Sequence, residues 1–176
     1  MKKLSLISKA IILIITLTSC GITKGDPSQL DNIEINQIAV KMKSSASVKL
    51  GDRPQNVITS MGTPTNSYSE YWEMSEKDAL IYDYNGTKFN FLDNRLESYE
   101  LSSPVYLVGN TSTGIFFNVE SSLGSVSSYL PNWSSKKNDG TLSANITNGG
   151  QQTDKFIYIE FNPSTEIITK ISISSY

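Results

Sequence analysis

The chain has 176 residues, with 15 basic and 17 acidic side chains and a net charge of −2. It contains no histidine and one cysteine, which removes the commonest general base, the commonest transition-metal ligand and any zinc site built from several thiolates. The excess of acidic residues argues against binding to nucleic acid.

The first 20 residues show the zones of an exported lipoprotein. A basic start, Met-Lys-Lys at residues 1–3, precedes an apolar run over residues 10–17. That run is too short to span a bilayer, so it predicts a signal peptide rather than a transmembrane helix. The ending at residues 17–20, Leu-Thr-Ser-Cys, resembles the lipobox of bacterial lipoproteins, in which the peptide is cut before the cysteine and the thiol is diacylated.

The lipobox resemblance implies that residues 1–19 are removed and that lipid, such as palmitate, on Cys20 holds the protein on a membrane. The removed peptide takes three of the 15 basic residues with it, which leaves 12 basic against 17 acidic residues and a net charge of −5. Cys20 is the only cysteine and cannot form an internal disulfide, so lipidation gives this thiol a use. We therefore expect a lipid-anchored protein of the bacterial cell envelope, and Gly21 favours the outer membrane in a Gram-negative host.

After Cys20 the chain is expected to form a tether before the folded part begins. Within residues 20–46, the first ten or so positions after the cysteine are small and polar and cannot build a core. The apolar spacing of residues 32–42 is compatible with a short strand or a short helix. From residue 47 the pattern is more regular, and Asp52 is expected to cap a helix with Pro54 in its first turn and Gly62 after its last.

Aromatic strands are predicted to follow this helix. Residues 80–84 and 87–91 alternate around Asn-Gly at positions 85–86, which favours a tight hairpin because both residues tolerate positive φ. Asp-Asn at positions 93–94 predicts a second turn before a strand over residues 96–101. We interpret residues 47–105 as a first α+β unit.

The same order of elements is predicted again in residues 106–176. A helix carrying Leu123, Val126 and Leu130 should be followed by strands over residues 141–147, 156–161 and 167–174. A shift of 69 residues aligns the two halves, pairing Val48 with Phe117, Leu50 with Val119, Val57 with Val126 and Met61 with Leu130. The predicted fold class is therefore α+β, with two tandem units that each contain a helix and a three- or four-stranded antiparallel sheet.

The first unit resembles the SmpA/OmlA outer-membrane lipoproteins and the β-lactamase inhibitor protein. The resemblance covers residues 47–101 and rests on four segments, namely Val48-Lys49-Leu50-Gly51-Asp52, Met61-Gly62-Thr63-Pro64, Glu70-Tyr71-Trp72-Glu73 and Phe91-Leu92-Asp93-Asn94-Arg95-Leu96. Met61 and Asn94 depart from the Leu and Gly common in that family. The resemblance implies a small antiparallel sheet with helices on one face, a binding surface on the other, and action by protein–protein contact without a cofactor.

No arrangement of residues in the sequence indicates catalysis. Carboxylates gather at Glu70, Glu73, Glu76, Asp78 and Asp83, but the polar residues among them favour a solvated loop and strand edge over a paired acid and base. The chain has neither the spacing of a calcium-binding EF-hand loop nor a Gly-x-Ser-x-Gly motif. We expect no enzyme activity, no cofactor and no metal site.

Eight aromatic side chains lie between residues 68 and 99. Tyr71, Trp72, Tyr82 and Tyr84 form the candidate binding surface, because tyrosine and tryptophan on an exposed sheet face offer broad apolar area with a polar tip. We expect this surface to hold another envelope protein. Carbohydrate binding by the same aromatics, aided by Asn and Asp side chains, is the alternative, and an enzyme of unrecognised type is a third.

Overall fold

The computed structural model describes residues 30–127, 129–131 and 140–175. These residues form an eight-stranded mixed sheet in the order β1-β9-β10-β11-β6-β5-β4-β3 and a three-stranded sheet in the order β2-β7-β8. The strands of the large sheet are β1 (Asp31–Glu34), β3 (Asn66–Trp72), β4 (Lys77–Tyr84), β5 (Thr87–Leu92), β6 (Arg95–Leu101), β9 (Thr141–Asn148), β10 (Gln151–Asn162) and β11 (Ile167–Ser175). The small sheet contains β2 (Ile38–Met42), β7 (Tyr106–Asn110) and β8 (Ile115–Asn118). The helical elements are α1 (Pro54–Met61) and two 3₁₀ turns, η1 (Ile35–Gln37) and η2 (Leu123–Val126).

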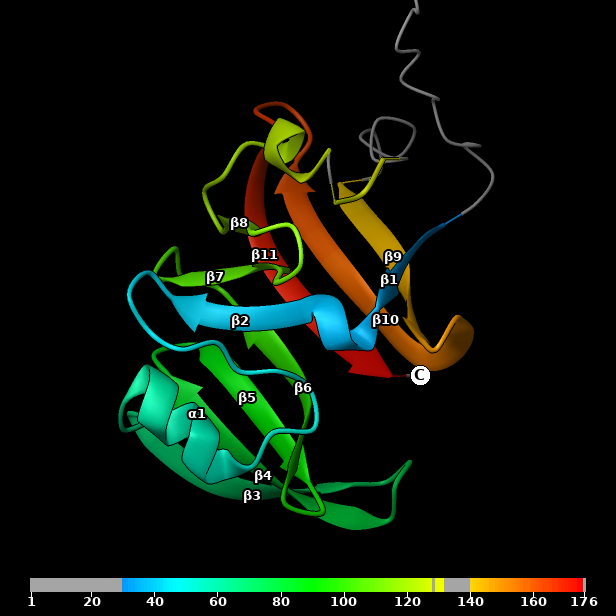
Figure 1. The fold of residues 1–176 in the computed structure, drawn as a ribbon. Coiled ribbons are helices and arrows are strands. Elements are labelled where there is room, and N and C mark those ends of the chain that lie inside the picture. Colours follow the sequence, from blue (N-terminus) through cyan, green and yellow to red (C-terminus); the bar gives the residue numbers. More distant parts are fainter. Residues whose placement is uncertain (1–29, 128, 132–139, 176) are drawn as a thin grey trace, which may run out of the picture.

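The small sheet and α1 cover the same face of the large sheet. In Figure 1, β2 and β7 cross in front of the strands of the large sheet, and α1 lies in front of β4 and β5. Buried apolar side chains from all three parts form one core, including Val57 of α1, Val108 of β7 and Phe89 of β5. No described helix or strand covers the opposite face of the large sheet, which we call the open face.

Strand alternation decides which side chains enter the core. In β5, Phe89 lies opposite Tyr82 of β4 and Tyr99 of β6, and these side chains point to the core. The next residue, Asn90, lies opposite Ile81 and Ser98 and points to the open face. The same two-residue period continues across the sheet and separates an apolar face from a largely polar one.

The helix begins and ends where the sequence predicts. Pro54 is its first residue, and the N–H of Gly62 donates to the carbonyl of Ile58 at 2.8 Å while Gly62 adopts a φ of 84°. The predicted capping role of Asp52 is wrong, because the N-cap position is held by Arg53 and no side chain caps the helix. Asp52 instead accepts a hydrogen bond from the backbone N–H of Lys49 at 2.8 Å and stabilises the turn before the helix.

Both tight turns predicted in the first half are confirmed. Asn85 and Gly86 connect β4 to β5 with φ values of 56° and 94°, and Asp93 and Asn94 connect β5 to β6 with φ values of 49° and 62°. Two consecutive residues at positive φ match the twist of a hairpin, which is why Asn, Asp and Gly are favoured there.

The predicted α+β fold of two tandem helix-plus-sheet units is wrong. Of the residues that the structure describes, 56% are in strands and 11% are helical, with one α-helix among them, and most of the strands join one large mixed sheet. Leu123 and Val126 lie in a four-residue 3₁₀ turn, and Leu130 follows in the loop. All three are buried, but the serines and glycine between them favour tight turns over a continued helix.

The hairpin of β7 and β8 was missed by the sequence interpretation. It pairs with β2 to make the small sheet, and Val108 lies opposite Val40 on one side and Phe117 on the other. Gly109 allows the close approach of β8, because a Cβ at this position would come within 2.1 Å of the carbonyl oxygen of Ile115. The sequence placed no element here, although the small sheet provides a large share of the core.

One local arrangement occurs twice, with its turn residues 69 residues apart and its strand residues 72 residues apart. Gly51 has a φ of 85°, its N–H donates to Leu96 O, and Leu96 N donates to Asp52 O. Glu120 has a φ of 77° and its N–H donates to Ile168 O, whose own N–H in turn donates to Ser121 O. Each turn thus ties the segment before a helical element to a strand of the large sheet.

The predicted signal peptide, Cys20 and the tether up to residue 29 lie outside the described residues. Among those that are described, no helix has the length and apolar character needed to cross a bilayer. The large sheet draws strands from both predicted units, since Tyr99 and Leu101 of β6 pair with Ile173 and Ile171 of β11.

Candidate functional site

The structure divides the four predicted aromatic residues between two faces of the large sheet. Trp72 is half-buried at the end of β3 and pairs with Lys77 on the open face, and its neighbour Tyr71 is 59% exposed. Tyr82 and Tyr84 share the other face of β4, directed to the core. The four therefore do not form one continuous surface.

Contacts with the core hold both tyrosines of β4. The ring of Tyr82 is half-buried and meets Phe91 edge-on, with 5.0 Å between ring centroids. Tyr84 is buried and its hydroxyl donates to the carbonyl oxygen of Gly62 at 2.9 Å. Burial, together with the nearby rings of Tyr106 and Tyr82, raises the pKa of Tyr84 to about 12. Tyr84 thus ties β4 to the end of α1.

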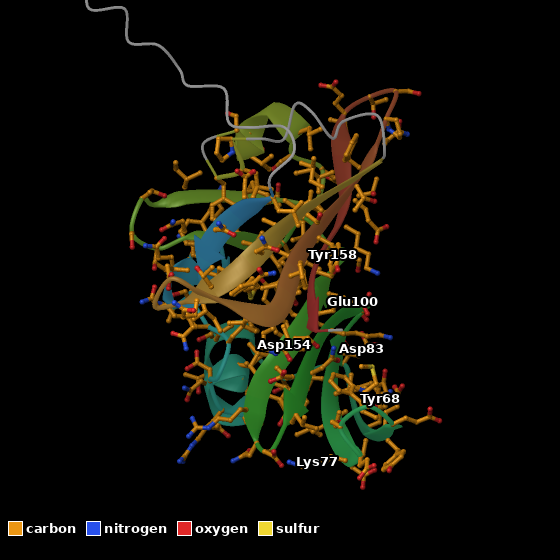
Figure 2. The ribbon with its side chains drawn as sticks, turned by 90° about the vertical axis from the view of Figure 1, so that its right-hand side faces the viewer. Tyr68, Lys77, Asp83, Glu100, Asp154 and Tyr158 are labelled. Carbon is orange, nitrogen blue, oxygen red and sulfur yellow. The ribbon has the colours of Figure 1, made fainter. Side chains whose placement is uncertain are left out.

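A groove of about 740 Å³ lies on the open face, where the hairpin between β3 and β4 stands beside β6 and β11. Residues 71–75 of the hairpin form one wall, and residues 172–174 of β11 with Asp154 of β10 form the other. Figure 2 shows Tyr68, Asp83 and Glu100 on the side of the sheet away from α1, which is the side where the groove opens. The hairpin wall carries Met74, whose side chain is 84% exposed. We call this site the hairpin groove.

Two buried polar side chains line the hairpin groove. Asn90 of β5 and Ser98 of β6 are 8% and 7% exposed and lie opposite each other in the sheet. The side-chain amide of Asn90 donates to Ser98 Oγ at 2.9 Å. Asn90 Oδ1 accepts no hydrogen bond from any described residue, so it remains available as an acceptor inside the groove.

Negative charge dominates the lining of the groove. Glu73, Glu97, Glu100 and Asp154 line it, against the single cation Lys170. The Lys170 ammonium lies 2.7 Å from Glu100 Oε2, and this hydrogen bond is the main reason why the pKa of Lys170 is raised.

The remaining carboxylates of the groove differ in whether a salt bridge compensates their charge. Glu97 is paired with Lys155, whose side chain is largely buried. Glu73 and Asp154, on opposite walls, form no salt bridge with any residue that the structure describes. The groove thus carries two uncompensated carboxylates facing solvent.

A second, mainly apolar cleft of about 700 Å³ lies on another part of the molecule. It is lined by Met42 and Lys43 at the end of β2 and by Pro104, Val105 and Leu107 around the start of β7. Val105 is 51% exposed there. No aromatic or unpaired acidic side chain lines this cleft, so it serves below as a reference surface for the hairpin groove.

The carboxylates noted in the sequence do not converge. Asp83 accepts a hydrogen bond from Gly86 N–H at 2.7 Å and stabilises the hairpin turn at the far end of β4 from Glu73. In the described part of the chain, no three or more acidic or cysteine side chains are grouped so that they could hold a metal ion. The hairpin groove offers acceptors, negative charge and an aromatic side chain, which is an arrangement suited to binding.

Sequence reasoning found Trp72 and its neighbour but missed the rest of the groove. Asn90 was detectable in principle as a polar residue between the buried Phe89 and Phe91, and Ser98 as a polar residue before the buried Tyr99. Asp154 and Lys170 carry no such signal, because they join the site only through the pairing of β6 with β11.

Comparisons of the chain with protein-family models, with curated proteins and with solved structures found no match.

Proposed function

We propose that the protein is a lipid-anchored lipoprotein of the bacterial cell envelope whose folded part binds another envelope protein. The binding site is the hairpin groove, and lipid on Cys20 keeps the protein at the membrane. The observation that carries the proposal is the groove itself, an aromatic and acidic hollow on a sheet face left uncovered by every described element.

The hairpin wall has the composition of a protein-binding surface. Tyr71 and Met74 are the two most exposed large apolar residues of the described chain, at 59% and 84% exposure. Neither side chain belongs to the core. Trp72 between them is half-buried and can be covered further by a partner. Aromatic residues and methionine are enriched where proteins meet, because they contribute large contact areas when desolvated.

The groove is open along the sheet face rather than a closed cavity, which suits a segment of polypeptide better than a small molecule that must be enclosed. Carbohydrate remains the competing ligand, since Trp72 and the polar side chains of the groove could also contact a sugar ring. The test below separates the two.

A photo-cross-linking amino acid placed at Met74 in the full chain, in its native membrane, tests the protein-binding proposal. A matched control carries the same amino acid at Val105, which is also exposed but lies at the second cleft. We expect a discrete protein adduct from position 74 that is lost on Trp72→Ala, and none from position 105. Saturable binding of a glycan that is lost on Trp72→Ala, with no adduct at position 74, would replace the proposal by carbohydrate binding.

The anchoring half of the proposal has its own test. Radiolabelled palmitate should enter the wild-type chain and should not enter a Cys20→Ser variant, which should leave the membrane fraction. Incorporation of label into Cys20→Ser would contradict lipidation at this residue.

A further inference from the structure

We infer that the segment bound in the hairpin groove is a basic, extended polypeptide that presents arginine or lysine side chains to Glu73 and Asp154. This inference rests on the proposed function and specifies the chemistry of the partner. The charge of the groove, its hydrogen-bonding groups and the apolar side chains of its wall all favour such a segment.

Charge is the first step. Four carboxylates and one ammonium line the groove, and the ammonium is already bound to Glu100. Glu73 on the hairpin and Asp154 on β10 have no salt-bridge partner in the described chain and lie on opposite walls. A partner with positive charge would compensate both, whereas an acidic segment or an anionic lipid surface would be repelled.

Hydrogen bonding is the second step, and it is independent of the charges. Asn90 is more than nine-tenths buried, lines the groove, and has a side-chain oxygen that accepts no hydrogen bond in the described residues. Because this oxygen is not among the fully buried, unpartnered side-chain atoms of the described residues, it is accessible from the groove and can accept a hydrogen bond from a ligand that brings N–H donors. A guanidinium group carries five such donors and no acceptor, which matches a site rich in oxygen atoms.

The wall of the groove supplies the third step. The ring of Trp72 and the thioether side chain of Met74 lie beside the acidic Glu73. Arginine and lysine have long apolar stems that pack on such side chains, and their cationic groups are attracted to the face of an indole ring. One side chain can thus use the apolar wall and the carboxylate together.

The length of the groove favours several contacts along one segment. It runs from the hairpin across β5 and β6 to the end of β11. Glu73 lies in the turn between β3 and β4, and Asp154 lies on β10, which β11, β6 and β5 separate from β4 in the sheet. Neighbouring strands lie about 4.8 Å apart, and an extended chain crosses that width with a few residues. A single small cation cannot reach both carboxylates, but a segment with spaced basic residues can.

The test measures binding of synthetic peptides to the full purified chain by calorimetry. The first peptide is an extended dodecapeptide with arginine at every third position among Ser and Gly, and the second has each arginine replaced by citrulline, which keeps the shape and removes the charge. The reference is the affinity of the arginine peptide for the wild-type chain. We expect the citrulline peptide to bind the wild type at least about tenfold more weakly than this. We expect the same loss when the arginine peptide binds the Glu73→Gln/Asp154→Asn double variant. Glu120→Gln removes an exposed acidic residue outside the groove and should leave affinity unchanged.

Three results would overturn the inference. The first is equal binding of the arginine and citrulline peptides, and the second is equal binding of the arginine peptide to the double variant and the wild type. The third is that spermidine binds as tightly as the arginine peptide and displaces it, which would assign the groove to small polyamines. Loss of this inference is distinguishable from loss of the proposed function. If a protein adduct forms at position 74 but peptide binding does not depend on charge, the partner is a protein of another chemistry. If no adduct forms, the proposed protein partner is contradicted.

Discussion

Buried tyrosine hydroxyls show how single atoms decide stability in this protein. Tyr84 donates its hydroxyl hydrogen to Gly62 O, while the hydroxyls of Tyr99 and Tyr129 are buried and have no hydrogen-bond partner among the described residues. Burial raises the pKa of Tyr99 well above its ordinary value and raises that of Tyr129 as well. A buried hydroxyl without a partner loses its hydrogen bonds to water and gains no hydrogen bond within the protein.

The pair Tyr99→Phe and Tyr84→Phe gives a matched prediction at this scale. Tyr99→Phe removes an unpartnered hydroxyl and should leave the free energy of unfolding unchanged or raise it by up to about 1 kcal/mol. Tyr84→Phe removes a satisfied hydrogen bond at the end of α1 and should lower it by about 1 kcal/mol. Urea unfolding followed by circular dichroism measures both, and a loss of stability in Tyr99→Phe comparable to that in Tyr84→Phe would contradict the assignment.

At the scale of elements, the first strand depends on one carboxylate. β1 is a four-residue edge strand that pairs in parallel with β9, and Glu34 at its end accepts hydrogen bonds from Thr147 Oγ1 at 2.8 Å and from the N–H groups of Gly149 and Gly150 at 3.0 and 2.7 Å. These bonds, that from Thr147 first, lower the pKa of Glu34 below 4.5. The carboxylate therefore attaches the first described strand after the predicted tether to the turn between β9 and β10.

This attachment should depend on pH. Because the pKa of Glu34 is lower in the folded protein than in the unfolded chain, its contribution to stability is present above pH 4.5 and is lost as the pH falls through the folded value. Hydrogen exchange of the amides of β1 should be faster in Glu34→Gln than in the wild type at pH 7, and after correction for intrinsic exchange the two should converge as the pH falls far enough to protonate Glu34 in the folded protein. Equal exchange at pH 7 would show that the carboxylate charge does not hold β1.

At the scale of the whole molecule, the junction of β6 with β11 joins strands from the two predicted units into one sheet. Leu101 and Ile171 are fully buried and lie opposite each other at this junction, and Tyr99 lies opposite Ile173. The same junction forms part of the hairpin groove, because Ser98 and Glu100 of β6 and Ser172 of β11 line it. Folding of the two halves and formation of the site are therefore coupled.

Ile171→Ala tests this coupling. The substitution removes buried apolar contacts and should lower the free energy of unfolding by about 2–4 kcal/mol. Because the sheet is continuous, hydrogen exchange should show β4 and β10 losing protection together in one unfolding transition. Loss of protection in β10 alone would show that residues 47–105 fold as an independent unit.

Local rules determined a clear part of this structure from the sequence. The turns at Asn85-Gly86 and Asp93-Asn94 and the limits of α1 depend on backbone preferences of the residues themselves, so they were predictable without knowledge of the fold. The basic and apolar N-terminus with Cys20 is likewise a linear pattern, and it still predicts a lipoprotein. The aromatic content of β3 to β5 was also evident, and Trp72 lines the groove as a side chain available to a ligand.

Only the tertiary structure decided the rest. Tyr82 and Tyr84 alternate in the sequence as an exposed aromatic face would, but the same alternation serves a core, and the packing of α1 and the small sheet determined which face is buried. The residues at 123–130 have helical spacing of buried positions, yet their serines and glycine form a turn. Asp154 and Lys170 reach the groove through strand pairing over more than 50 residues of chain, for example from Tyr99 to Ile173. Such long-range pairing depends on the combined burial of both strands, a property that no local pattern carries.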